Sequence, residues 1–326
     1  MQRRHFILSS SAAGLALAWP AARAQTLPDT LRIFAGFAAG GTVDTTARRV
    51  ADKLRDVLAK SVVVENRTGA GGQIALSALK AAAPDGLTLL VTPMSMLGIY
   101  PHTYKKLPYD PVADFQPVSQ AVRFDFGFGV GPMVPASVKT LAEFVAWCKA
   151  NPKDANFGSP AAGSVPHFVA ELFGRAAGID FKHIPYRGTQ PAIADMMGGQ
   201  VASVSGPVGE FLQHLPTGRV RLLATSGSAR NRFAPTVPTY AEQGFRDIVF
   251  EEWFGFFMPA NVPADVLART STAIRSALGA PDVVDALALM GLEARSSTPT
   301  ELAALLKRDT ERWAPLVKTI GFTADS

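Results

Sequence analysis

The stretch Asn156-Phe-Gly-Ser-Pro-Ala-Ala-Gly-Ser-Val-Pro-His167 decides how this chain of 326 residues is interpreted. It predicts a short strand, a loop of small and hydroxylated residues, and the start of a helix. Downstream, Ile184-Pro-Tyr-Arg-Gly-Thr189 predicts a second strand that ends in a turn. A loop before a helix presents backbone N–H groups at the positive end of that helix, which favours an anion such as a carboxylate. No general base with an orienting partner accompanies these loops, so they indicate binding rather than catalysis.

The same alternation of strands and helices extends in both directions from this stretch, and it predicts an α/β fold with a parallel sheet covered on both sides. The turn Gly36–Thr42 separates a strand from a helix, and Gly69–Gly72 opens another helix. Residues 98–120 contain four prolines, and we expect irregular structure there. Strands are expected at Leu31–Phe37, Ser61–Glu65, Leu87–Val91, Phe124–Val130, 156–158, 181–186, 201–205, 220–225 and Trp253–Met258.

The two α/β sets predict two lobes with a cleft between them. The chain crosses between the sets twice, near 124–130 and near 249–258. We therefore predict one lobe from residues 25–125 together with 252–326, and a second lobe from residues 126–251. The helical C-terminal segment is expected to return to the first lobe.

The N-terminus predicts export. Arg3 and Arg4 precede an apolar run from Ala12 to Trp19, and Ala22-Arg23-Ala24 has small residues where a signal peptidase cleaves. We predict a signal peptide over residues 1–24, removed after about Ala24, and a periplasmic mature protein that is not inserted in a membrane. The arginines are compatible with either the twin-arginine or the general export route. Three of the 32 Lys and Arg residues lie in this segment, which leaves 29 against 27 acids, so charge does not indicate a nucleic-acid partner.

Other site types are disfavoured by the residues that they would need. The glycines of Gly69–Gly72 lack the third glycine of a dinucleotide fingerprint, and Gly36–Thr42 lacks the lysine of a phosphate loop. No histidine pair has the helical spacing of a zinc site. We therefore expect neither a cofactor nor a metal. Cys148 is the only cysteine, and its position on an apolar helical face predicts core packing.

One catalytic alternative depends on Ser159, Ser164 and His167, which together suggest an exported hydrolase. Neither serine lies in the G-x-S-x-G turn of an α/β-hydrolase, and no acid can be assigned to His167 from the sequence. We therefore expect no catalytic residues.

Taken together, the motifs resemble those of the exported solute receptors of tripartite tricarboxylate transporters, often called the Bug family. The resemblance covers almost all of the chain after residue 24, and no single motif carries it. The matching segments are Ala39–Asp44, Val64–Gly72, Pro84–Gly86, Leu107–Asp110, Asp114-Phe115, Gly158–His167, Pro185–Gly188, Gly198–Val201, Val237–Thr239, Glu242, Gly244 and Trp253.

The resemblance implies a type II periplasmic-binding fold that closes on a small organic acid and has no catalytic step. It implies that two facing loops hold one ligand carboxylate, partly through ordered water. The family usually has a proline where this chain has Ala39, and the loss of its fixed φ is expected to loosen the first loop slightly. The implied ligand-binding residues are Phe37, Ala39, Gly40, Gly41 and Thr42 in the first loop, Ser159, Ala162, Gly163, Ser164 and His167 in the second, and Tyr186, Arg187, Gly188 and Ser205 nearby.

The leading functional hypothesis is therefore a periplasmic receptor that captures a small carboxylate and delivers it to the subunits of a membrane transporter. A sensory module that reports the ligand to a membrane sensor kinase is the alternative that the sequence leaves open. No acidic residue is clearly placed to bind an amino group, which favours a plain carboxylate over an amino acid. The distal wall of the pocket is expected after Val91 and around Ser205-Gly206-Pro207.

Overall fold

The computed structural model describes residues 27–324, and one continuous sheet runs through them. The predicted signal peptide and its cleavage site lie outside the described residues. The strands are β1 (Thr30–Ala35), β2 (Ser61–Asn66), β3 (Thr88–Pro93), β4 (Phe115–Val130), β5 (Asn156–Ser159), β6 (Lys182–Pro185), β7 (Ser203–Pro207), β8 (Arg221–Thr225), β9 (Glu251–Pro259) and β10 (Glu293–Ala294). Their order is β2-β1-β3-β9-β4-β7-β5-β6, and β8 and β10 also pair with β4.

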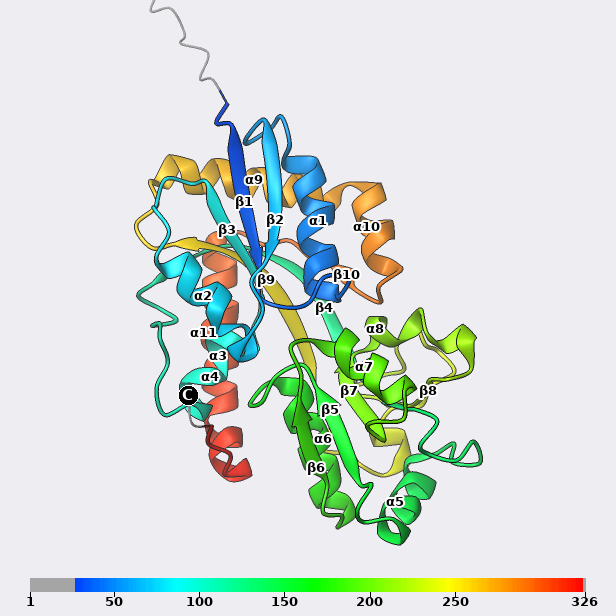
Figure 1. The fold of residues 1–326 in the computed structure, drawn as a ribbon. Helices are drawn as coiled ribbons and strands as arrows, with labels where there is room; N and C mark the ends of the chain where they lie inside the picture. The colour runs from blue at the N-terminus through cyan, green and yellow to red at the C-terminus, as the bar shows by residue number, and fades with distance from the viewer. Residues whose placement is uncertain (1–26, 325–326) are drawn as a thin grey trace, which may run out of the picture.

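The long strand β4 joins two regions of this sheet, which Figure 1 shows as an upper and a lower part of the molecule. From Phe115 to Asp125, β4 pairs with β9. From Phe126 to Val130, it pairs with β7 and β8 instead. We call the part with β1, β2, β3, β9 and β10 the first sheet region, and the part with β5, β6, β7 and β8 the second sheet region.

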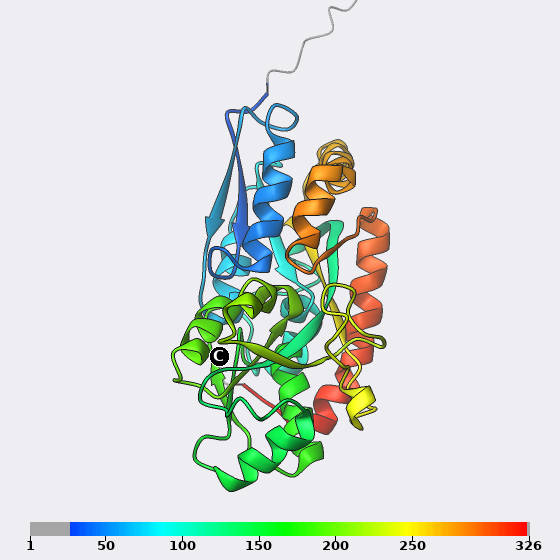
Figure 2. The ribbon, with the colours of Figure 1, turned by 90° about the vertical axis from the view of Figure 1, so that its right-hand side faces the viewer.

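Helices connect the strands and cover the sheet, as the alternating pattern predicts. They are α1 (Thr42–Leu54), α2 (Gln73–Lys80), α3 (Ser95–Gly98), α4 (Tyr100–Thr103), α5 (Leu141–Ala150), α6 (Val165–Ala177), α7 (Thr189–Met197), α8 (Val208–Leu212), α9 (Ala264–Gly279), α10 (Pro281–Ala288) and α11 (Pro299–Ile320), with short 3₁₀ turns η1 (Ala70–Gly72), η2 (Leu215–Thr217) and η3 (Ala241–Gln243). Figure 2 shows α11 running beside both sheet regions. In α11, Trp313 lies 6.0 Å from Phe168 of α6, measured between ring centroids.

Local chemistry explains where the helices begin. Helix α5 starts with the predicted capping box, in which the Thr140 hydroxyl accepts from Glu143 N and the Glu143 carboxylate accepts from Thr140 N. Helix α1 buries the apolar face expected from its spacing, including Val43, Ala47 and Val50.

The parallel sheet is only part of the architecture. Strand β1 is parallel to β2 and β3, and β5 is parallel to β6 and β7, as predicted. The strands that connect the two regions differ, because β4 runs antiparallel to β9 and to β7. The sheet is therefore mixed, with antiparallel strands at the centre.

The expectation of irregular structure over residues 98–120 was wrong in part. Helix α4 occupies Tyr100–Thr103, and β4 begins at Phe115 and continues through Pro117. The pairing with β9 shifts register between Pro117 and Ser119. Proline cannot donate a hydrogen bond to the neighbouring strand and usually ends a strand. Here the bulge accommodates Pro117, so β4 continues past it.

The interior is closely packed and rich in phenylalanine. Cys148 is buried within it, as predicted, and burial raises the pKa of its thiol to about 12. A thiol in this environment remains protonated and packs as a small apolar side chain.

Candidate ligand-binding site

A pocket lies between the two sheet regions, and its volume of about 480 Å³ includes space that is open to solvent. The N-termini of three helices reach it, because Thr42 begins α1, Ser164 precedes α6 and Thr189 begins α7. The lining comprises Phe37, Ala38, Gly41, Thr42, Val43, Pro93, Ser95, Met96, Phe124, Phe126, Pro160, Ala161, Ser164, Pro166, Gly188, Thr189, Gln190, Pro207, Glu210, Glu252 and Phe254. Helix N-termini carry partial positive charge, so their convergence suits a negatively charged group.

The first predicted loop contributes Phe37, Gly41 and Thr42 to the lining, while Ala39 and Gly40 are exposed outside it. The carboxylate of Asp44 accepts from Gly40 N at 2.9 Å. Backbone donors that the sequence analysis assigned to a ligand are therefore already paired within the protein.

The second predicted loop contributes Ser164, whose hydroxyl donates to the backbone oxygen of Ala161 at 2.7 Å. Ser159 is buried beyond the lining, with its hydroxyl 2.8 Å from Nε2 of His183. Ala162 and Gly163 also lie outside the lining. Pro160 and Ala161, which follow β5 directly, belong to it.

His167 lies beside the pocket rather than in it. Its Nδ1 accepts from Gly163 N at 3.0 Å, and its ring stacks on His183 with the centroids 4.0 Å apart. Burial, with a smaller contribution from His183, lowers the pKa of His167 to about 2. The ring is thus neutral and braces the loop, and neither Ser159 nor Ser164 hydrogen-bonds to it among the contacts of residues 27–324.

The third predicted segment contributes Gly188, which has a φ of +142° and approaches Ala38 of the first loop. A Cβ at Gly188 would lie 3.3 Å from the Ala38 Cβ, so glycine permits this close contact between the two regions. Tyr186 donates to Asp195 at 2.9 Å, and Arg187 is exposed; neither lines the pocket.

The expected distal wall is present in part. Pro93 and Ser95, which follow Val91, line the pocket, and so does Pro207. Ser205 does not, and its buried hydroxyl has no hydrogen-bond partner.

Two acidic residues that the sequence analysis did not identify line the pocket. Glu210 of α8 is 4% exposed and Glu252 of β9 is 3% exposed. Among residues 27–324, no lysine, arginine or histidine lines the pocket, so these acids are its only charged side chains. The sequence analysis had found no acidic residue clearly placed to bind an amino group; the structure places these two acids in the lining of the pocket.

Glu210 reaches across from the second sheet region to the start of α1. Its Oε1 accepts from Thr42 N at 3.1 Å and from Thr42 Oγ1 at 2.7 Å. Its Oε2 is buried and has no hydrogen-bond partner. Burial raises the pKa of Glu210, against smaller opposing contributions from Thr42 and Gln190.

Glu252 is held by Ser95, which donates to its Oε1 through both the backbone N–H, at 2.8 Å, and the hydroxyl, at 2.5 Å. Ser95 Oγ also accepts from Val165 N, the first residue of α6, at 3.2 Å. Burial raises the pKa of Glu252 to about 7, with Asp309 adding to the rise and Ser95 opposing it. One serine thus links this acid to the second predicted loop.

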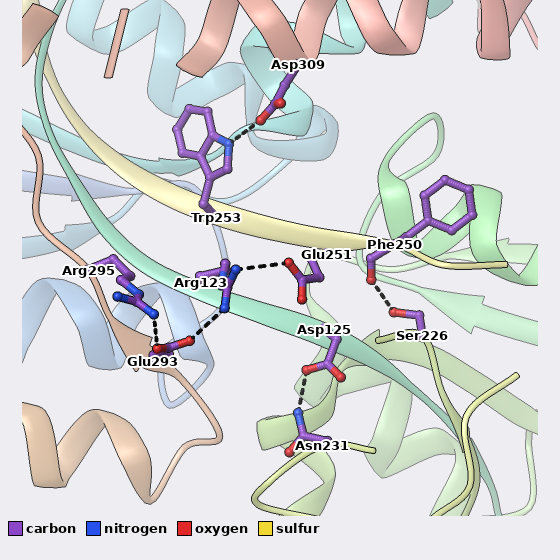
Figure 3. Close-up of polar contacts among 10 residues, drawn as sticks. All are labelled: Arg123, Asp125, Ser226, Asn231, Phe250, Glu251, Trp253, Glu293, Arg295 and Asp309. Atoms are coloured by element: carbon purple, nitrogen blue, oxygen red, sulfur yellow. Dashed lines mark hydrogen bonds and ion pairs between the residues drawn. The ribbon is translucent and has the colours of Figure 1, made fainter. Parts of the chain in front are cut away.

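The opposite faces of β4 and β9 have different chemistry. Side chains alternate along a strand, so Phe124, Phe126, Glu252 and Phe254 line the pocket. Figure 3 shows the other face, where Arg123 bridges Glu251 at 3.4 Å and Glu293 at 3.2 Å. Figure 3 also shows the contacts of Arg295 with Glu293, of Asn231 with Asp125, and of Trp253 Nε1 with Asp309 at 2.7 Å.

Within residues 27–324, no group of three or more His, Cys, Asp or Glu side chains is arranged to hold a metal ion. None of the helices in this part of the chain combines the length and apolar character needed to cross a membrane.

The fold and the pocket between its two halves define a solute-binding protein of the periplasmic-binding class. The family model for the tripartite tricarboxylate transporter family receptor matches residues 46–322. Protein BugT of Bordetella pertussis is 33% identical over 292 residues, which cover 89% of this chain and 89% of BugT. The chain therefore belongs to the tripartite tricarboxylate transporter receptor family, whose members are solute-binding receptors rather than enzymes.

Solved structures confirm the predicted fold. Periplasmic binding protein BugD superposes with a TM-score of 0.85 at 27% identity, covering 91% of this chain and 99% of BugD. MatC of Rhodopseudomonas palustris, solved with bound malate, gives a TM-score of 0.82 at 29% identity and covers 89% of this chain and 99% of MatC.

Proposed function

We propose that this protein captures a small carboxylate in the pocket between its two sheet regions and delivers it to a tripartite tricarboxylate-type membrane transporter. The observation that carries the proposal is the meeting of the N-termini of α1, α6 and α7 in one pocket. Glu210 already occupies the Thr42 donors of α1, so the ends of α6 and α7, at Ser164 and Thr189, are the positions for a ligand carboxylate. The malate bound to MatC supports this ligand class.

The predicted binding residues take two roles in this proposal. Phe37, Gly41, Thr42, Ser164 and Gly188 contact the ligand directly, because they line the pocket. The other predicted residues lie outside the lining, and we assign them a supporting role around the pocket: Ala39, Gly40, Ser159, Ala162, Gly163, His167, Tyr186, Arg187 and Ser205. Several hydrogen bonds of about 1 kcal/mol each, stronger to a charged acceptor, support micromolar binding, which corresponds to about −8 kcal/mol.

We further propose that the lobes divide into residues 25–125 with 252–326, and residues 126–251, and that they open and close around β4 and β9. A ligand that contacts both lobes stabilises the closed form, which a transporter can recognise. The periplasm is the proposed location, with the signal peptide removed after about Ala24. The arginine-led, apolar N-terminus and the likeness to the periplasmic binding protein BugD support this location.

Isothermal titration of the chain beginning at Gln25 against a panel of small organic acids tests the ligand class. Ala38 is half-buried and lines the pocket, so Ala38→Phe is expected to weaken binding at least tenfold. Ala113→Phe, at an exposed position outside the lining, is the matched control and should leave binding unchanged. Tight binding of neutral solutes only, with no carboxylate bound, would refute the proposal.

A further inference from the structure

The side chain of Glu210 is fixed on one side and unsatisfied on the other. Thr42 fixes Oε1 with two hydrogen bonds, of 3.1 Å and 2.7 Å. Oε2 remains buried, without a hydrogen-bond partner, in a residue that lines the pocket.

Among the side chains of residues 27–324, none hydrogen-bonds to Oε2. Gln190 acts on the Glu210 carboxyl group and lowers its pKa, but the Gln190 Nε2 donates to the backbone oxygen of Glu210 at 3.3 Å and its Oε1 lies 3.1 Å from His214 Nε2. A buried polar atom without a hydrogen-bond partner is destabilising, and more so when it is charged.

Within the part of the chain that the structure describes, the rest of the pocket offers no cationic side chain to a second ligand carboxylate. Among residues 27–324, the lining has two ionisable side chains, Glu210 and Glu252, and both are acids. A dicarboxylate that bound here would place a like charge beside them in a medium of low dielectric constant. The lining phenylalanines, which include Phe124 and Phe254, instead offer ring faces that attract cations.

We propose that Glu210 recognises a protonated nitrogen of the ligand, so that this receptor selects amino-carboxylic acids over dicarboxylates of similar length. The inference deepens the proposed function and rests on the pocket being its ligand site. The ligand carboxylate lies at the N-termini of α6 and α7, and the ammonium group donates to Oε2. An N–H donor is required, so a primary amine satisfies the site and a quaternary ammonium does not.

Matched ligand pairs test the inference on the unaltered protein. The pairs are β-alanine with succinate, and 6-aminohexanoate with adipate, in which one end changes from ammonium to carboxylate. Putrescine, which has amines and no carboxylate, and glycine betaine, whose nitrogen has no N–H, complete the panel. We expect the amino acid of at least one pair to bind ten times more tightly than its diacid, and glycine betaine to bind weakly.

The outcomes separate this inference from the proposed function. Binding of the diacids in preference to their amino counterparts overturns the role of Glu210 and leaves the carboxylate receptor intact. If putrescine binds and none of the carboxylates does, the role of Glu210 is supported and carboxylate capture is overturned. If no member of the panel binds, both are overturned.

Glu210→Gln sharpens the test, because its amide oxygen can still accept from Thr42 while the charge is removed. We expect at least a tenfold loss of affinity for the amino ligand and less than a threefold change for the diacid. Glu311→Gln, at an exposed acid of α11, is the charge-matched control. An affinity for the amino ligand that is equal in the Glu210→Gln and Glu311→Gln variants would overturn the inference, and the ligand pairs decide it even if Glu210→Gln does not fold.

Discussion

The two faces of strands β4 and β9 place acids in opposite circumstances. On the face of Figure 3, Glu251 and Glu293 are both paired with Arg123, and all three side chains are partly exposed to solvent. On the pocket face, the neighbouring residue Glu252 is buried and has Phe124 opposite it in the adjacent strand. Adjacent positions of one strand thus differ in exposure and in the presence of a cationic partner.

This difference distinguishes structural acids from acids available to a ligand. An exposed acid needs no cation, since water solvates it, and its ion pairs contribute little to stability. A buried acid without a cation is costly unless a proton or another positive group joins it. The pocket acids are therefore the ones whose protonation state and stability should respond to pH and to a bound molecule.

The largest expected effect comes from Glu252→Gln, which keeps the amide oxygen as an acceptor for Ser95. Burial holds the native pKa of Glu252 at about 7, above its usual value of 4.5, so the native state retains a proton that the unfolded chain loses between these values. The stability from this proton is fully present below about pH 4.5 and is lost as pH rises to about 7. The loss corresponds to roughly 3 kcal/mol.

Urea unfolding between pH 4.5 and pH 8 measures this effect as the difference between wild type and variant. The free energy of unfolding of Glu252→Gln should rise relative to wild type across the interval and level off above pH 7. Glu251→Gln, one residue along on the exposed face, should differ from wild type by less than about 1 kcal/mol. Equal pH slopes for wild type and Glu252→Gln would show that Glu252 has the same pKa in the native and unfolded states and would contradict this prediction.

The next largest effect on stability is expected from the hydroxyl of Ser226, which lies where the chain passes from one sheet region to the other. Buried Ser226 accepts from Phe126 N at 2.9 Å and donates to the oxygen of Phe250 at 2.6 Å, so it joins β4 to the segment that enters β9. Ser226→Ala leaves two buried backbone groups without this partner and should lower the free energy of unfolding by about 2 kcal/mol. The exposed residue Ser228 provides the matched Ser228→Ala control in the same urea titration. If the free energy of unfolding falls by the same small amount in both variants, water replaces the Ser226 hydroxyl, and the link between β4 and the segment before β9 does not depend on it.

The sequence predicted those parts of the structure that depend on nearby residues. The spacing of Val43, Ala47 and Val50 identified α1, and Thr140 with Glu143 identified the start of α5. The glycine and serine loops at Gly41 and Ser164 were recognised because they directly precede helices. Periodicity and capping act within a few residues, so one sequence suffices to detect them.

The acids of the pocket could not be predicted in this way. Glu210 meets Thr42 across 168 positions, and Glu252 meets Ser95 across 157, so only the folded chain brings them together. The sequence did contain a weak signal for Glu252, which by period-two spacing shares a strand face with Phe254 and Phe256, where an acid is unusual. Pro117 led to the opposite kind of error. It favoured irregular structure, but a register shift allows β4 to continue past it.

The smallest expected effect is that of Arg123→Met on the exposed face. This change removes the ion pairs to Glu251 and Glu293 while retaining much of the apolar stem of the side chain. Since the arginine side chain is 46% exposed, solvent already screens both pairs, and the free energy of unfolding should fall by less than about 1 kcal/mol. Urea titration in low salt and in 1 M NaCl measures this change, which should shrink at high salt because ions screen the same charges. A salt-independent loss of 2 kcal/mol or more would place Arg123 among the buried structural groups and would remove the contrast between the two faces of β4 and β9.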